Sequence, residues 1–403
     1  MPRLIQLLEF KTMPNIQHEA AWCITNIATG TRAQVQCLVE KGVIPKLIAL
    51  INEENSNLVD QAIWALGNIS GDNISFRNII LGYGIVPKLT NLLATTKNTE
   101  MLKNGCWVIS NLTRGEPYPK FETVKDLIPT ICKLIRENDD NELLIDCCTS
   151  LTNLAEIAQD KGKMFADNNI LERLVKLLRY SLINKYSNTN MTVIYPVLRC
   201  LGSLLTGSDI ETQMVIEAGV VKALGALLRV SKSIPRKEAA WALSNIAAGT
   251  EHQIQALINE GLINNLVDLA SKDRFEVRRE CIWCLSNAIT NSNAEQIKVL
   301  VQAGATEAIC SILFVGDPRT IAIALEGIEN LLKRSNSLIG SAYLEEIILR
   351  IEKCKGLNAL ENLELHSNSY IYEKAIGIIE EFFGVEDEIE SSDPPRSISI
   401  FDF

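Results

Sequence analysis

The 403-residue chain has few histidines and no long apolar run. It contains only three histidines, His18, His252 and His366, which lie far apart and share no motif. No run of about 18 consecutive apolar residues occurs, and no signal-peptide pattern precedes the first predicted helix. These absences argue against a membrane span and favour an intracellular protein.

Cysteines are more numerous but do not form a recognisable framework. There are eleven, an odd number, and most fall at apolar helix positions, as Cys106 and Cys200 do. Such positions predict buried, reduced thiols. Cys281 and Cys284 have the spacing of half a zinc site, but no second pair or histidine partner follows them. We therefore predict no metal and no cofactor.

The chain also lacks an excess of basic residues. It carries 39 Lys and Arg against 49 Asp and Glu, a net charge of −10. Proteins that bind nucleic acid present a basic face, so the charge argues against nucleic acid and favours a basic partner. No glycine-rich phosphate loop and no nucleophile with a positioned base can be assembled. We therefore expect no enzyme.

A repeated pair of residues is the strongest positive signal. Trp is followed four residues later by Asn at Trp22/Asn26, Trp64/Asn68, Trp107/Asn111, Trp241/Asn245 and Trp283/Asn287. The Asn column continues through Asn153, Ser203 and Asn330, with steps of 42 or 43 residues and one step of 50. A period of about 40 to 47 residues is typical of armadillo and HEAT helical repeats.

A second column has the same period and marks turns. Its members precede apolar runs: Gly42, Gly84, Asp126, Asn169, Gly219, Gly261 and Gly304. Gly, Asn and Asp tolerate the left-handed backbone that ends one helix. Each unit is thus predicted to contain a short helix, a second helix and a long third helix, and three helices per unit favour armadillo over HEAT. The predicted fold is all-α, a right-handed armadillo-repeat superhelical solenoid.

The repeat pattern also predicts how the chain is divided. Residues 1–30 resemble a truncated first repeat, since the chain opens on a second-helix pattern. Residues 31–384 hold about eight further repeats, with an inserted loop near residues 180–191 that accounts for the step of 50. Residues 385–403 are acidic and then Ser/Pro-rich, and they are predicted to be a disordered tail.

The Trp/Asn pairs predict a peptide-binding groove. Residues four apart share one helix face, so stacked third helices would line a concave surface with indoles and amides. Asn can both donate to and accept from a peptide backbone, whereas indole faces attract the cations of Lys and Arg. Acidic residues in register with this column, such as Asp72, Asp146, Glu238 and Glu280, could pair with those cations.

At this density the motifs resemble importin-α, the armadillo adaptor for classical nuclear localisation signals. The matching stretches are residues 18–30 (HEAAWCITNIATG), 61–72 (QAIWALGNISGD), 237–249 (KEAAWALSNIAAG) and 356–366 (GLNALENLELH). The resemblance covers essentially the whole chain. It implies two sites for basic peptides.

The resemblance assigns residues to both sites. The first site, the family's major one, would comprise Trp22, Asn26, Gly30, Gln61, Trp64, Asn68, Asp72, Asn104, Trp107, Asn111 and Asp146. The second, minor site would comprise Arg199, Glu238, Trp241, Asn245, Glu280, Trp283 and Asn287. Gly30 and Asp72 match the positions that hold the key lysine of a signal.

Some positions depart from the family pattern. Between the sites the Trp column holds Thr149 and Arg199, and Arg199, the family's usual residue there, would repel a basic chain. Val35 stands where the family usually has a Thr hydroxyl near the key lysine, which predicts weakened discrimination at that position. Asn153 replaces a Tyr, and Ser203 replaces an Asn.

The resemblance further implies partners. Family members recruit importin-β through a basic N-terminal arm, absent from this chain, and an export receptor through the C-terminal repeats, while shuttling between cytoplasm and nucleus. Two alternatives stay open. One is an armadillo scaffold that binds other peptide partners, and the other is a specialised relative with altered cargo choice.

Overall fold

The computed structural model describes residues 1–51, 54–183, 190–315 and 317–384, which contain helices and no strand. They fall into two units, Met1–Ser292 and Asn293–Phe403. The predicted loop near residues 180–191 lies largely outside the described residues, since α13 continues to Ile183 and α14 begins at Asn190. The predicted tail, residues 385–403, lies outside them entirely. No described helix is both long and apolar enough to cross a membrane.

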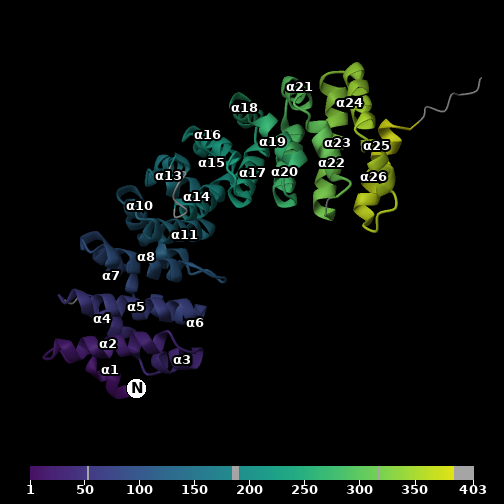
Figure 1. Ribbon diagram of the computed structural model, residues 1–403. Coiled ribbons are helices and arrows are strands. Elements are labelled where there is room, and N and C mark those ends of the chain that lie inside the picture. The colour runs from purple at the N-terminus through teal and green to yellow at the C-terminus, as the bar shows by residue number, and fades with distance from the viewer. Residues whose placement is uncertain (52–53, 184–189, 316, 385–403) are drawn as a thin grey trace, which may run out of the picture. The chain divides into compact units, whose positions relative to one another are not determined.

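Three helix types recur in order, as the sequence predicts (Figure 1). The first helices are α3 (Arg32–Glu40), α6 (Ile74–Gly82), α9 (Phe121–Val124) with the 3-10 helix η1 (Lys125–Leu127), α12 (Lys161–Asp167), α15 (Asp209–Glu217), α18 (Glu251–Asn259), α21 (Ala294–Gln302) and α24 (Ser341–Lys353). The second helices are α1 (Pro2–Leu7), α4 (Val43–Leu50), α7 (Ile85–Thr95), α10 (Ile128–Glu137), α13 (Leu171–Ile183), α16 (Val220–Leu227), α19 (Leu262–Lys272), α22 (Ala305–Ile312) and α25 (Gly356–Leu363). The third helices are α2 (Pro14–Ala28), α5 (Ser56–Asp72), α8 (Thr99–Thr113), α11 (Asn141–Ile157), α14 (Asn190–Leu205), α17 (Ser233–Ala247), α20 (Phe275–Asn291), α23 (Pro318–Leu338) and α26 (Ser369–Phe382).

The turns between first and second helices largely follow the predicted column. Its five glycines have φ between 65° and 93°, and Asn169 has φ 48°. Asp126 was predicted to turn in the same way, and this prediction is wrong. Here α9 runs through η1 directly into α10, so Asp126 lies inside a 3-10 helix and no left-handed residue is needed. Lys355 takes the left-handed conformation before α25, with φ 64°.

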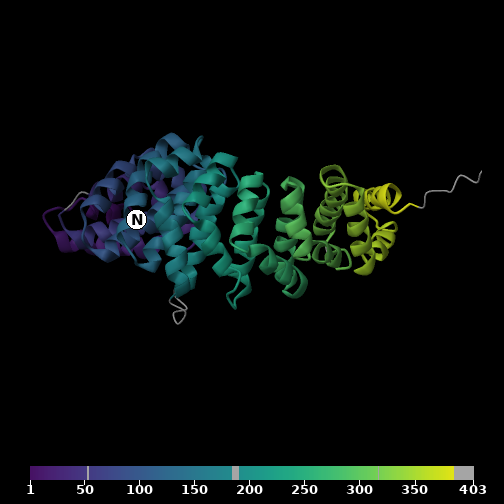
Figure 2. The same cartoon turned by 90° about the horizontal axis from the view of Figure 1, so that it is seen from above.

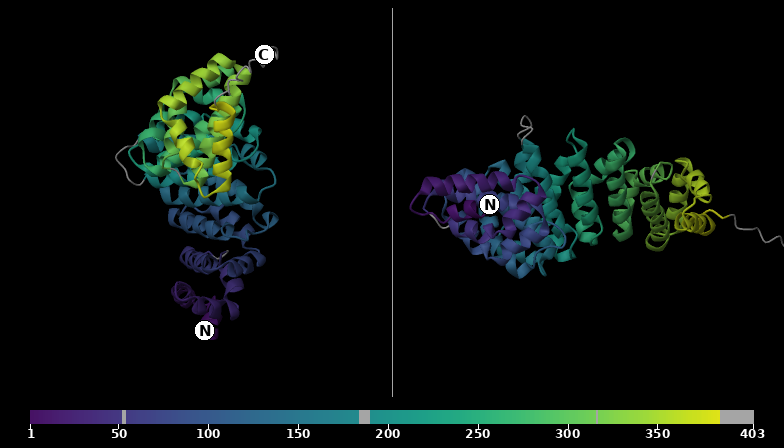
Figure 3. Two further views of the ribbon diagram at one scale, coloured as in Figure 1. Left: turned by 90° about the vertical axis from the view of Figure 1, so that its right-hand side faces the viewer. Right: turned by 90° about the horizontal axis from the view of Figure 1, so that it is seen from below.

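In the first unit the third helices form an unbroken row. Each packs against the next from α2 through α5, α8, α11, α14 and α17 to α20. Figures 2 and 3 show the repeats as successive layers. The row has a buried side, to which Leu66 and Leu243 belong, and a solvent-facing side that we call the third-helix face. Trp22 and Trp64 lie on this face and are 50% and 44% exposed.

The second unit contains two further repeats. Helix α23 packs against α22 and α24, and α26 packs against α23 and α25. Its core is aliphatic and includes Ile328, Leu332, Ile347 and Leu360. Neither of its third helices carries a Trp/Asn pair. All predicted site residues therefore lie in the first unit.

Candidate peptide-binding face

The first site forms an open hollow on the third-helix face. It has a volume of about 370 Å³ and is lined by Ala28, Thr29, Gly30, Gly67, Asn68, Gly71, Asp72, Trp107, Asn111 and Arg114. The hollow brings together residues from α2, α5 and α8, as well as Gly30 and Arg114, which follow α2 and α8. Five predicted residues, Gly30, Asn68, Asp72, Trp107 and Asn111, thus share one space.

Local structure explains why Gly30 belongs there. The Gln34 side chain folds back to accept a hydrogen bond from Thr31 N–H at 2.7 Å, which caps α3. A Cβ on Gly30 would come within 2.2 Å of Gln34 Oε1. Gly30 has no side chain, so its backbone lines the hollow directly, and the Gln34 amide oxygen occupies the place beside it that a Cβ would approach.

The acid of this hollow has no cation beside it. Asp72 is exposed, and its only hydrogen bond within the described residues comes from Asn73 Nδ2, at 3.0 Å to Oδ2. The Arg114 guanidinium lines the same hollow but donates to Gly71 O at 3.1 Å. Asp72 therefore remains available to an incoming cation.

The predicted Asn ladder is partly used within the protein. Asn111 Nδ2 donates to Gly67 O at 3.1 Å, and Asn287 Nδ2 donates to Ser244 O at 3.1 Å. By contrast, the buried Nδ2 atoms of Asn68 and Asn245 have no hydrogen-bond partner among the described residues. A buried polar group without a partner is costly. The described residues thus leave these two amide nitrogens without an acceptor.

A second hollow of about 330 Å³ adjoins the first site. It is lined by Lys103, Asn104, Trp107, Glu142, Ile145 and Asp146. Asn104 Nδ2 donates to Asp60 Oδ1 at 2.8 Å, which orients that amide. Four predicted residues of the first site line neither hollow. Trp22 and Trp64 are exposed on the third-helix face, Asn26 is exposed on α2, and the Gln61 Oε1 atom is buried without a partner in the described structure.

Asp146 is held in an environment that disfavours its charge. Burial raises its pKa to about 6, and the nearby Glu142 carboxylate raises it as well, against the opposing hydrogen bond from Ser110. Glu142 is itself paired with Lys103, whose Nζ lies 3.1 Å from Glu142 Oε2 and 3.2 Å from Asp140 Oδ2. A cation placed in this hollow would relieve the unfavourable charge on Asp146.

The second site differs because its acids already have cationic partners. Arg199 Nε lies 3.4 Å from Glu238 Oε2, and Arg279 Nη2 lies 2.9 Å from Glu280 Oε1. The Arg199 guanidinium also lies over the rings of Trp241 and Tyr195. Glu238 and Glu280 are thus already paired with arginines of the chain itself, and their pairing with ligand cations stays a prediction. Trp283 and Trp241 are half-buried on the same face.

The positions that depart from the family pattern also have defined surroundings. Val35 is fully buried and does not line the first hollow. Asn153 Nδ2 donates to Thr113 Oγ1 at 3.4 Å, and the buried Ser203 hydroxyl donates to Cys200 O at 2.8 Å. Thr149 is half-buried on α11 and contributes no aromatic ring. Asn153 therefore links α11 to α8, Ser203 bonds within α14, and Thr149 leaves a gap in the indole column.

Several residues that shape the face were missed from the sequence. Gly67 seats the Trp107 indole, since a Cβ there would lie 2.2 Å from Trp107 Cζ3, and Gly202 seats the Trp241 indole in the same way at 2.4 Å. Both glycines lie about one repeat before the Trp that they contact, and this spacing could have identified them from the sequence. Arg114 and Tyr195 carried no such signal.

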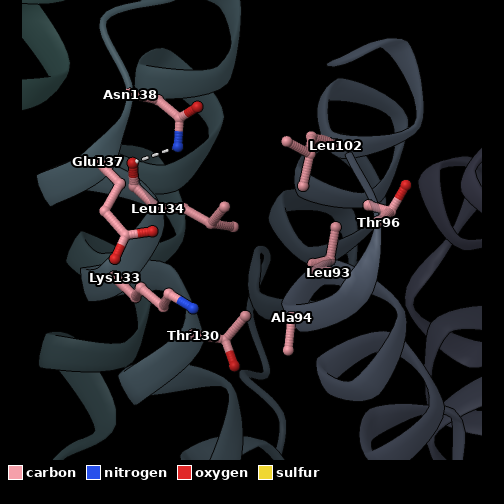
Figure 4. Close-up of a pocket in the computed structure, with 9 residues that line it drawn as sticks. All are labelled: Leu93, Ala94, Thr96, Leu102, Thr130, Lys133, Leu134, Glu137 and Asn138. Atoms are coloured by element: carbon pink, nitrogen blue, oxygen red, sulfur yellow. Dashed lines mark hydrogen bonds between the residues drawn. The ribbon is translucent and has the colours of Figure 1, made fainter. Parts of the chain in front are cut away.

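Another hollow lies away from this face, between α7, α8 and α10 (Figure 4). It has a volume of about 220 Å³, and its lining includes Lys133 and Glu137 beside Leu93 and Leu134. The Asn138 side chain donates to Leu134 O at 3.0 Å there. The hollow contains none of the predicted site residues and no aromatic ring, so it is not the candidate site.

Comparison with known proteins agrees with this geometry. The armadillo/beta-catenin-like repeat family matches residues 1–29, 31–71, 76–114, 208–248 and 250–290, and an atypical Arm repeat matches residues 345–396. Among solved structures, an engineered protein matches with a TM-score of 0.67 at 24% identity, over 95% of this chain and 98% of that one. A designed armadillo repeat protein in complex with peptide (KR)4 matches with a TM-score of 0.54 at 29% identity, over 63% of this chain and 99% of that one.

Similarity over nearly the whole of this chain is found to importin subunits alpha, of whose own length the chain spans about three quarters. Importin subunit alpha-1b of Oryza sativa subsp. japonica is 36% identical over 96% of this chain and 72% of its own length. Importin subunit alpha-7 of Arabidopsis thaliana is 42% identical over 95% and 73%. Importin subunit alpha-B of Dictyostelium discoideum is 41% identical over 99% and 76%. With this similarity and its armadillo repeats, the chain belongs to the importin subunit alpha family.

Proposed function

We propose that this chain is a nuclear import adaptor that binds Lys/Arg-rich nuclear localisation signals as extended peptides along the third-helix face. A single-cluster signal would occupy the first site, and a bipartite signal would occupy both sites. The observation that carries the proposal is the first hollow, whose lining includes Gly30, the Trp107 ring and Asp72, a carboxylate with no cation partner among the described residues.

The side chains of the first site have complementary roles in this proposal. The exposed rings of Trp22 and Trp64 would take the aliphatic stems of Lys or Arg, with cation–π attraction of about 0.5 to 2 kcal/mol each. Asp72 and the Gly30 carbonyl would hold one ammonium group. Asn68, whose Nδ2 has no partner among the described residues, would donate to a peptide carbonyl.

The spacing of the helices supports an extended ligand. Packed helices lie about 8 to 10 Å apart, and an extended chain advances about 3.3 Å per residue. A peptide lying across the row would therefore pass two to three residues per repeat. A second cation three to four residues from the first would reach the hollow that contains Asp146 and Glu142.

The structural comparison adds support for the ligand class. The designed armadillo protein that aligns with this chain was solved with (KR)4, a peptide of alternating Lys and Arg. An armadillo stack can thus hold a purely basic peptide. Recruitment of importin-β, docking of an export receptor on the C-terminal repeats and shuttling between cytoplasm and nucleus are parts of the same proposal, implied by the family.

A peptide titration tests the proposal. A fluorescent peptide with a Lys-Lys-x-Lys core is titrated with the chain and followed by anisotropy, beside a peptide of the same length with Glu in place of Lys. We expect binding of the basic peptide only. The Asp72→Lys variant should weaken binding at least tenfold, because it places a cation where the ligand ammonium would lie.

The matched control is Glu40→Lys. Glu40 is exposed on α3, away from the third-helix face, and its substitution changes the net charge by the same amount. Equal weakening by both substitutions would show a nonspecific charge effect and contradict the proposed site. Binding of the acidic peptide instead would favour an armadillo scaffold with other partners.

A further inference from the structure

Arg199 lies where the proposed function places a ligand cation in the second site. Its Cζ is 5.1 Å from the centroid of the Trp241 ring and 5.4 Å from that of the Tyr195 ring. Its Nε is 3.4 Å from Glu238 Oε2. In the second site the chain thus supplies its own cation to both the indole and the acid. The corresponding groups of the first site have no such cation among the described residues.

We propose that Arg199 is an internal ligand of the second site, which a basic peptide must displace before it can use Trp241 and Glu238. This inference rests on the proposed function and deepens it. Arg199 makes the second site the weaker of the two for a short basic peptide, and it restricts that site to ligands anchored elsewhere on the face.

The surroundings of Trp241 show why a ligand cation would compete with Arg199. Helix α14 supplies both Gly202, which lets the indole pack closely, and Arg199, which lies over the ring. A ligand cation on that face of the ring would need the position that Arg199 holds.

Glu238 gives the second reason for competition. The residue is only 2% exposed, so its carboxylate needs a cationic partner to offset the loss of water. Lys237 Nζ lies 3.0 Å from Oε1, but the geometry makes no hydrogen bond, and Oε1 has no donor among the described residues. Arg199 is therefore the cationic partner of Glu238 Oε2, and a ligand cation could pair with this carboxylate in its place.

The contact that Arg199 makes is one that a ligand could replace. At 3.4 Å, the Arg199–Glu238 distance exceeds the 2.7 to 2.9 Å of a strong charge-assisted hydrogen bond. The Arg199 side chain is 44% exposed, so it can turn into solvent without losing much packing. Displacement therefore costs affinity without blocking the site.

The first site provides the internal comparison. Its acid, Asp72, has no cation partner within the described residues, and Trp64 is 44% exposed with no cation over its ring there. The two sites share the Trp/Asn framework, and among the described residues a guanidinium lies over an indole in the second site alone. We therefore expect removal of Arg199 to make the second site resemble the first in affinity.

The test uses the full chain with Asp72→Lys, so that binding reports mainly the second site. Anisotropy titrations with the Lys-Lys-x-Lys peptide compare this background with added Arg199→Ala, Arg199→Gln or Arg199→Lys. We expect Ala and Gln to tighten binding about 2- to 5-fold, the range of one exposed cation–π contact. Arg199→Lys, which keeps the charge, should tighten it less.

Arg229→Ala is the matched control for general electrostatics. It removes one positive charge from a residue after α16 that bonds to Asn265 Oδ1 and lies outside the site. If it tightens binding as much as Arg199→Ala does, the effect is long-range charge and the inference is wrong. Circular dichroism checks that each variant is folded, and Arg199→Gln replaces Arg199→Ala if the latter is not.

Failure of this inference can be distinguished from failure of the proposed function. If the unmodified chain binds the basic peptide and Arg199→Ala weakens or does not change binding in the Asp72→Lys background, Arg199 is a positioning residue and is not a competitor. If the unmodified chain does not bind the basic peptide at all, the proposed function fails and this inference fails with it.

Discussion

The Trp107 indole packs directly on the backbone of Gly67, a residue of the preceding third helix. A Cβ at Gly67 would come within 2.2 to 2.9 Å of three ring atoms, and such an approach requires the ring to move. The same indole lines both hollows of the first site. Gly67 therefore sets the position of the Trp107 ring, which is the group proposed to contact the ligand.

Gly67→Ala should displace the Trp107 ring. Overpacking of this kind typically costs about 1 to 3 kcal/mol, so we expect a lower melting temperature and weaker binding of a basic peptide. The measurements are thermal unfolding followed by circular dichroism and peptide anisotropy.

Gly82→Ala is the control for this substitution. Gly82 is also helical, and a Cβ there would meet nothing within 4 Å. It should be neutral or slightly stabilising, since Ala is the better helix former. Unchanged binding in Gly67→Ala would show that Trp107 does not contribute to the site.

Asp146 predicts a pH dependence of peptide binding. Its pKa, raised to about 6 by burial, means that it gains a proton as pH falls through that value, so it can no longer attract a cation. A bound cation would in turn lower this pKa. We expect affinity for a peptide that reaches this hollow to decline between pH 7.5 and pH 5, measured by anisotropy at constant ionic strength.

Asp146→Asn should remove this part of the pH dependence and bind as the protonated protein does. It should also raise stability at neutral pH, because a carboxyl whose pKa is higher in the folded state destabilises the fold increasingly as pH rises from its unfolded pKa, about 3.9, to about 6. If the pH profiles of the two proteins coincide, Asp146 does not face the ligand.

Arg236 and Asp273 form a two-point ion pair behind the second site. Arg236 Nε and Nη2 donate to the two carboxylate oxygens at 2.6 and 2.8 Å, and the side chains are only 14% and 7% exposed. Asp273→Asn leaves the guanidinium without its anion and should cost about 2 to 4 kcal/mol. Urea unfolding measures this change.

The same pair has a defined pH signature. The Arg236 hydrogen bonds lower the pKa of Asp273. The resulting stability is present above the unfolded pKa, about 3.9, and is lost as pH falls toward the folded value. Asp268→Asn, at an exposed pair with Lys272, should change stability by less than about 1 kcal/mol. Equal losses in the two variants would contradict this account.

The sequence was sufficient where one residue type has one physical consequence. Gly42 predicts a left-handed turn because glycine alone adopts it without strain, whereas Asp126 merely tolerates it and does not adopt it. Lys355, with its left-handed φ, was not predictable because lysine rarely adopts that conformation. The Trp/Asn period likewise predicted which residues share the face.

Contacts between repeats could not be predicted in this way. Whether Asn111 bonds to a ligand or to Gly67 O depends on side-chain rotamers and on the distance between α5 and α8. The stacking of Arg199 on Trp241 depends on how α14 meets α17. Sequence periodicity specifies which face a residue occupies, but it does not specify the partner across the gap.

The bond from Asn111 to Gly67 O has a counterpart in the bond from Asn287 to Ser244 O, and each accepting carbonyl immediately precedes an Asn whose own amide nitrogen is unoccupied. Two distant stretches of the chain thus carry the same arrangement of atoms. In each, one Asn side chain bonds two neighbouring helices together, and the Asn of the preceding helix has no partner for its Nδ2 among the described residues. From this duplication we expect that one helix pair can replace the other. A variant in which α5 and α8 replace α17 and α20 would test whether two copies of the same helix pair suffice to bind a bipartite signal.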